Sequence, residues 1–129
     1  MLARDLYEFL GAQESTTELR AAIAPAMPEY RRGLAERDPS SPAFITSDGS
    51  LLVLAASHLK RLCTAFLKGE IDESEISYIA TVFDLTPDFQ FISKEIEECA
   101  FFLSASEANG PPLQKVVPAV LRALREHAA

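Results

Sequence analysis

Apolar residues recur at intervals of three and four along most of the chain, the spacing that places side chains on one face of an α-helix. The clearest stripe lies between residues 51 and 68, and Gly69 follows as a helix-ending residue. Its apolar members are Leu52, Ala55, Ala56, Leu59, Leu62, Cys63 and Phe66. We expect this segment to form a helix at the centre of the fold.

Two stripes precede the central one. Residues 2–10 have the apolar spacing of a short helix, and the capping-box sequence at Ser15–Glu18 predicts the start of another. The second stripe, residues 19–34, runs through Pro25 and Pro28. Because each proline lacks a backbone donor and crowds the preceding turn, this segment is either one kinked helix or two helices in close succession. We favour the kink.

The second half of the chain predicts three further helices. Asp72 and Glu75 are spaced as a reciprocal cap at the start of the first of them. Ser93 is a suitable N-cap for a helix over 94–105, and an Asn-Gly-Pro-Pro breaker precedes a closing stripe over 113–124.

The segment 36–50 is rich in proline and serine and is predicted to be the longest loop. No clear pair of alternating strands is present. The pattern therefore predicts an all-α fold, a single-domain bundle of five to six helices over residues 1–129, with one short extended segment at most. A hairpin at 43–47 or 89–92 is the main departure to expect.

The acidic residues are concentrated in one part of the chain. The 129 residues include 19 acidic and 12 basic side chains, for a net charge of −7. Residues 70–107 hold ten of the acids against a single base, Lys94, whereas residues 1–69 are balanced at eight of each. A negative field repels phosphate backbones and anionic lipid and attracts basic proteins. We expect a basic protein partner, with no binding to nucleic acid or membranes.

The sequence has no apolar run of the roughly 20 residues needed to cross a bilayer, and its first residues lack a signal-peptide pattern. Its two cysteines, Cys63 and Cys99, are too few for a disulfide framework. We therefore expect a cytoplasmic protein in which both thiols are reduced and buried.

Catalytic and cofactor motifs are not found. The five glycines form no phosphate-binding loop, and Cys and His do not recur at the spacings of a zinc site. Of the two histidines, His58 falls on the flank of the central stripe and His127 lies near the end of the chain. We expect no enzymatic activity, no cofactor and no metal ligands.

Residues 84–95 resemble a calcium loop of the EF-hand kind in length. Asp84, Asp88 and Glu95 stand at its positions 1, 5 and 12. Position 6, which normally holds glycine for a sharp turn, is Phe89. Degenerate calcium binding at this segment is kept as one alternative.

The acidic segment itself has three interpretations. It is a solvated helix surface, a surface that binds a basic protein, or part of a homo-oligomer formed through Ala100–Leu103 or the closing helix. The functional hypothesis is the second, in which the chain neutralises or regulates a basic partner, for example as the immunity partner of a bacterial nuclease toxin. The predicted surface comprises Glu70, Glu73, Glu75, Asp84, Asp88, Glu95, Glu97 and Glu98, with Tyr78, Val82, Phe101 or Phe102 as anchors.

Overall fold

A computed structural model of the chain describes residues 3–11, 16–36, 49, 51–104 and 113–126. In these ranges it contains seven helices and two short strands. They are α1 (Ala3–Gly11), α2 (Thr16–Ile23), α3 (Met27–Glu36), β1 (Leu52–Leu54), α4 (Ala56–Leu67), α5 (Glu73–Leu85), β2 (Phe89–Phe91), α6 (Lys94–Ser104) and α7 (Leu113–Glu126). The predicted all-α class is confirmed.

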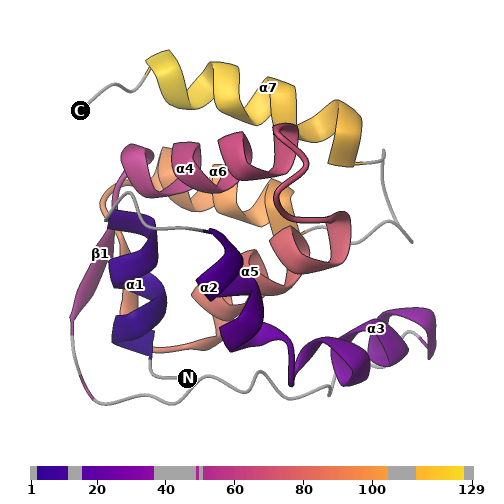
Figure 1. The fold of residues 1–129 in the computed structure, drawn as a ribbon. Helices are drawn as coiled ribbons and strands as arrows, with labels where there is room; N and C mark the ends of the chain where they lie inside the picture. Colours follow the sequence, from indigo (N-terminus) through magenta and orange to yellow (C-terminus); the bar gives the residue numbers. More distant parts are fainter. Residues whose placement is uncertain (1–2, 12–15, 37–48, 50, 105–112, 127–129) are drawn as a thin grey trace.

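Helix α4 is central, as predicted. It packs against α7 on one side and α1 on another, and it also contacts α5 and α6. Figure 1 shows α7 along one edge of the fold with α4 and α6 beneath it, while α3 lies at the opposite end. Leu59, Leu62 and Cys63 of α4 are buried in a hydrophobic cluster to which every described helix contributes. None of the described helices is long and apolar enough to cross a membrane.

The stripe over 19–34 forms two helices, so the prediction of one kinked helix was wrong. Helix α2 ends at Ile23, and a turn closed by the Ala26 N–H donating to the Ile23 carbonyl at 2.9 Å leads into α3. Pro25 lies in this turn. Inside a helix, its missing N–H donor would remove one backbone hydrogen bond. Pro28 occupies the first turn of α3, where backbone N–H groups have no intrahelical acceptor.

The prediction of a helix starting near residue 51 was also wrong at its first turn. Leu52–Leu54 form strand β1, which pairs in parallel with β2, Leu52 lying opposite Phe89. The Leu52 N–H donates to the Asp88 carbonyl and the Ile92 N–H to the Leu54 carbonyl, both at 2.9 Å. An extended segment at 89–92 was expected in a hairpin, but its partner is distant in sequence. The other predicted hairpin position, 43–47, lies outside the described residues.

Three predicted helix boundaries are confirmed. Asp72 and Glu75 form a complete capping box at the start of α5, with N–H to carboxylate distances of 2.9 and 2.8 Å. The Ser93 hydroxyl accepts from the Ile96 N–H at the start of α6. Gly69 follows α4 with a φ of 76°, a left-handed conformation that glycine adopts without strain. Ser15, predicted to cap the second helix, lies outside the described residues.

Helix α5 is buried on most of its surface rather than on one face. Eight of its thirteen residues are buried, including Glu75, Ser77 and Tyr78. The reason is that α3 packs on one side of it, α6 on another and α4 on a third. A helix enclosed in this way has little surface left for a partner at its N-terminal half.

Candidate functional site

The predicted acidic surface divides into two parts in the structure. Around the N-terminus of α5, the chain's own arginines pair with the acids. Arg20 of α2 donates to Glu75 with an Nε to Oε2 distance of 2.8 Å, and Arg31 of α3 donates to Asp72 at 3.1 Å. The Glu75 hydrogen bond and charge raise the pKa of Arg20. Two of the four acids at this end of the segment, Asp72 and Glu75, are therefore paired with arginines within the fold.

Four of the predicted surface residues lie inside the fold, which corrects their assignment. Tyr78 is only 1% exposed, and its ring meets Tyr30 edge-on at a centroid distance of 5.2 Å. Val82, Asp88 and Glu75 are also buried. A rigid partner cannot contact side chains that are already buried in the fold, so these four are removed from the candidate surface.

The remaining predicted acids differ in exposure. Glu70 and Glu73 are half-buried at the start of α5, whereas Asp84, Glu95, Glu97 and Glu98 are exposed. The exposed group lies at the C-terminal end of α5 and along α6. The structure thus brings only part of the predicted set together.

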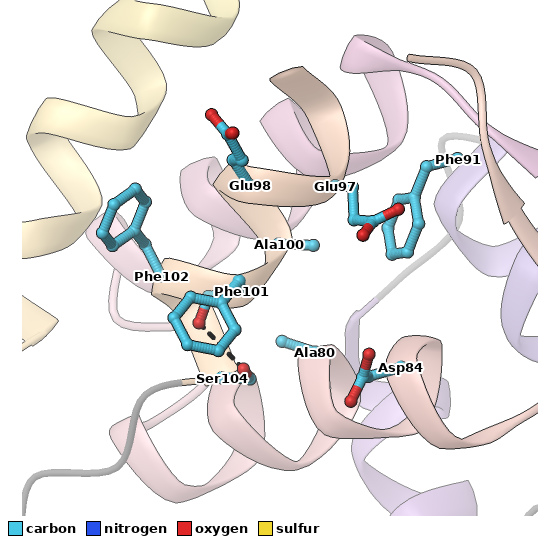
Figure 2. Close-up of a pocket in the computed structure, with 9 residues that line it drawn as sticks. All are labelled: Ala80, Asp84, Phe91, Glu97, Glu98, Ala100, Phe101, Phe102 and Ser104. Carbon is cyan, nitrogen blue, oxygen red and sulfur yellow. Dashed lines mark hydrogen bonds between the residues drawn. The ribbon is translucent and has the colours of Figure 1, made fainter. Parts of the chain in front are cut away.

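A hollow of about 490 Å³ lies between α5 and α6, within reach of these exposed acids. Figure 2 shows Asp84 and Ala80 on α5, facing Glu97, Ala100 and Phe101 on α6 across it. Its lining residues are Ala80, Asp84, Phe91, Glu97, Glu98, Ala100, Phe101, Phe102 and Ser104. These include three carboxylates and three phenylalanines but no basic side chain. The hollow therefore combines acidic and aromatic side chains on one concave surface.

Two of the three phenylalanines that line the hollow are exposed to solvent. Phe101 is 68% exposed and Phe102 53% exposed, with ring centroids 6.2 Å apart at an interplanar angle of 67°. Figure 2 shows the Phe101 ring over the hollow, the Phe102 ring on the α7 side of α6, and Phe91 beside Glu97. A hydrogen bond from the Ser104 hydroxyl to the Phe101 carbonyl, at 2.8 Å, ties down the last turn of α6.

Sequence reasoning identified Asp84, Glu97, Glu98 and the phenylalanine pair, but not Phe91. Phe91 reaches the hollow because strand β2 places it against α6. The sequence offered a weak signal, since an extended segment at 89–92 was considered, but nothing in it indicated which side of the strand would face the acids.

His58 is a boundary residue, as expected. Its ring stacks on Tyr7 at a centroid distance of 4.7 Å, and its Nδ1 accepts from the Ala55 N–H at 2.9 Å. Burial lowers the pKa of this imidazole. The side chain completes the first turn of α4 and stabilises its start, a structural use of histidine that needs no substrate.

Both cysteines are free and buried, as predicted. Burial raises the pKa of Cys63 to about 12. Burial, followed by the neighbouring Glu98 charge, also raises the pKa of Cys99. Because the thiolate is the reactive form, these thiols are poor nucleophiles in the folded state.

The segment 84–95 is not a single loop of the EF-hand kind. Asp84 belongs to α5, Phe89 to strand β2 and Glu95 to α6, so the twelve positions are divided among three elements instead of forming one loop. Among the described residues, no three or more His, Cys, Asp or Glu side chains are grouped so that they could hold a metal ion. The calcium alternative is therefore not retained.

Comparison of the chain with protein-family models, curated proteins and solved structures gave no match.

Proposed function

We propose that this chain is a protein-binding domain whose hollow between α5 and α6 receives a basic segment of a partner protein. A lysine or arginine of the partner would place its charged head between the Asp84 and Glu97 carboxylates. Its aliphatic stem would lie along the Phe101 ring. The chain would in this way mask or regulate a positively charged surface of the partner.

The observation that carries the proposal is the exposed Phe101 ring beside carboxylates of both helices. A phenylalanine face attracts a cation, most often arginine, by about 0.5 to 2 kcal/mol depending on desolvation. Carboxylates add charge-assisted hydrogen bonds, which are stronger than neutral ones. A few side chains, many of them aromatic or arginine, supply most of the binding energy of a protein interface.

The internal ion pairs of the fold strengthen this choice of site. Arg20 and Arg31 compensate Glu75 and Asp72 at one end of α5. Within the described residues, Asp84, Glu97 and Glu98 take part in no such pair. Three acids without an ion pair among the described residues therefore lie together at the hollow, where their charge would accelerate encounter with a basic surface.

The volume of the hollow matches the size of the proposed occupant. About 490 Å³ lies within the range of small binding pockets, roughly 300 to 1,000 Å³, and is enough for one or two long side chains. The chain would then recognise a short basic stretch at the hollow, with further contacts around it. Neutralisation of a cationic enzyme is the biological role that we favour for such a surface.

The proposal is tested with three variants, all with substitutions at exposed positions that should leave the fold unchanged. Asp84→Lys/Glu97→Lys reverses the charge of the hollow, and Phe101→Ser removes the anchor. Asp5→Lys/Glu8→Lys is the matched control, because these acids are exposed on α1 and the change in net charge is the same. Immobilised protein is used to capture binding partners from a lysate at low and high salt, with mass spectrometry and titration of each captured protein.

We expect basic proteins to bind the wild type and the α1 control and to be lost with both hollow variants. The charge reversal should slow association, and the Phe101 change should speed dissociation. If the α1 control loses capture as fully as the hollow reversal, net charge alone is responsible and the site is wrong. Unchanged capture by Phe101→Ser would likewise contradict the anchor.

A further inference from the structure

A second concave surface lies on the other side of α6, between that helix and α7. Its floor is apolar and includes Cys99, Val116, Val120 and Ala123, and its volume is about 520 Å³. Phe102 stands at its edge with about half of its surface exposed. Exposed apolar surfaces of this kind on small domains commonly mark interfaces.

The two rims of this groove carry opposite charges. On the α6 rim, Glu95 and Glu98 are exposed beside Phe102. On the α7 rim, Lys115 is exposed, and Arg122, seven residues later, lies on the same side of the helix. Among the described residues, Glu98, Lys115 and Arg122 make no ion pair.

This pairing of charges restricts what can cover the groove. A partner of uniformly positive charge would be repelled by the α7 rim, and one of uniformly negative charge by the α6 rim. A second copy of the same surface, turned about a two-fold axis that runs along the groove, sets each acidic rim against a basic rim. In such an isologous contact, opposite charges therefore face each other at both edges of the interface.

We propose that the groove between α6 and α7 is covered by a second copy of this chain, forming a two-fold dimer. The Phe102 rings and the apolar floors form the dry centre of the contact, and the Glu and Lys/Arg rims form its charged edges. The hollow between α5 and α6 lies on the other side of α6, so this inference does not depend on the proposed function, although Glu98 and Phe102 border both surfaces.

The test exchanges the charges of the two rims. Variant one is Glu95→Lys/Glu98→Lys, and variant two is Lys115→Glu/Arg122→Glu. Each variant alone would set like charges against like at both edges of its own dimer. A one-to-one mixture of the two would restore attraction at both edges, because the Lys rim of one faces the Glu rim of the other.

Sedimentation equilibrium of the wild type and of each variant measures the result. We expect a wild-type dimer, at least about tenfold weaker self-association for each variant alone, and a heterodimer in the mixture that regains the wild-type affinity. Exposed substitutions away from the groove serve as controls and should leave the dimer intact: Asp5→Lys/Glu8→Lys for the acids and Arg32→Glu/Lys68→Glu for the bases.

Three outcomes would overturn the proposal. The first is a wild-type monomer at concentrations up to about 1 mM, where even a weak specific contact is detectable. The second is a dimer that both variants leave unchanged, because the contact would then lie on another face. The third is a mixture that stays monomeric although both variants retain wild-type circular dichroism and melting, because the charge complementarity would then be absent.

Discussion

Replacing Glu75 by alanine removes two hydrogen bonds that hold the first turn of α5. One carboxylate oxygen accepts from the Asp72 backbone N–H at 2.9 Å, and the other accepts from the Arg20 guanidinium at 2.8 Å. Glu75 is only 3% exposed, so little water can enter to replace these contacts. The substitution therefore reports whether this acid is structural, as its burial indicates, or part of a surface, as the sequence suggested.

The magnitude follows from the two contacts. Loss of the reciprocal cap costs about 1 kcal/mol, and loss of a charge-assisted hydrogen bond about 1.5 to 3 kcal/mol. The second figure is reduced because the Arg20 side chain is about half exposed and regains hydration. We therefore expect Glu75→Ala to lower the free energy of unfolding by about 2 to 3 kcal/mol. Glu75→Gln should cost only about 1 kcal/mol because it retains an acceptor for the Asp72 N–H.

Urea denaturation followed by far-UV circular dichroism measures these differences. Glu97→Ala is the control, since Glu97 is exposed on α6 and should change stability by less than about 0.5 kcal/mol. A double-mutant cycle of Glu75→Ala with Arg20→Met isolates the ion pair and should give a coupling energy of about 1 kcal/mol. If Glu75→Ala is as silent as Glu97→Ala, the placement of this carboxylate in the fold is wrong.

Three further predictions address the core, the histidine and the thiols. Phe83→Ala, at a side chain that is 1% exposed, should cost about 3 to 5 kcal/mol in urea denaturation, whereas Phe101→Ala should stay within about 0.5 kcal/mol. Because burial lowers the pKa of His58, the unfolded chain takes up a proton at this histidine at a higher pH than the folded chain does. Stability should therefore fall as the pH drops below about 6.5, and His58→Gln should reduce that fall in pH-dependent melting curves. Cys63 and Cys99 should resist a thiol-specific reagent at neutral pH and react together once urea unfolds the chain, and rapid labelling of the native protein would contradict their burial.

Local signals in the sequence were sufficient to predict most of the helices. The apolar stripe of α4, the Asp72 and Glu75 capping box, the Ser93 cap and the terminating Gly69 all depend on residues within a few positions of one another. Such local interactions depend on the backbone geometry and hydrogen bonding of neighbouring residues. Helix starts and ends can therefore be predicted before any tertiary contact is known.

The parallel strand pair could not be predicted in the same way. Leu52–Leu54 is a short apolar run, which is as compatible with the first turn of a buried helix as with a strand. It is extended only because it pairs with Phe89–Phe91, which follow α4 and α5 in the sequence. The break between α2 and α3 had a visible cause in the prolines, but whether a helix bends or ends there depends on what the second segment packs against.

The same limit explains why the acidic segment was only partly understood. Glu75 and Glu97 are both acids near the start of a predicted amphipathic helix, and although the local pattern marks Glu75 as a cap residue, it does not indicate that Glu75 is buried and Glu97 exposed. They differ because α2 and α3 cover the first turn of α5, whereas the matching part of α6 faces solvent. Burial of a carboxylate requires a partner, and Arg20, 55 positions earlier in the chain, supplies it.

The arrangement of α2 and α3 also determines where on the molecule a basic partner could bind. Arg20 and Arg31 neutralise the start of α5, so the negative charge of residues 70–107 is not spread evenly along them. Charge that is already paired in the fold attracts a partner weakly, because the partner would have to displace an arginine held by short hydrogen bonds. The acids beside the exposed Phe101 ring require no such displacement. In the proposed interaction, a basic protein would therefore gain most at the hollow between α5 and α6, at the opposite end of α5 from the acids that are most closely spaced in the sequence.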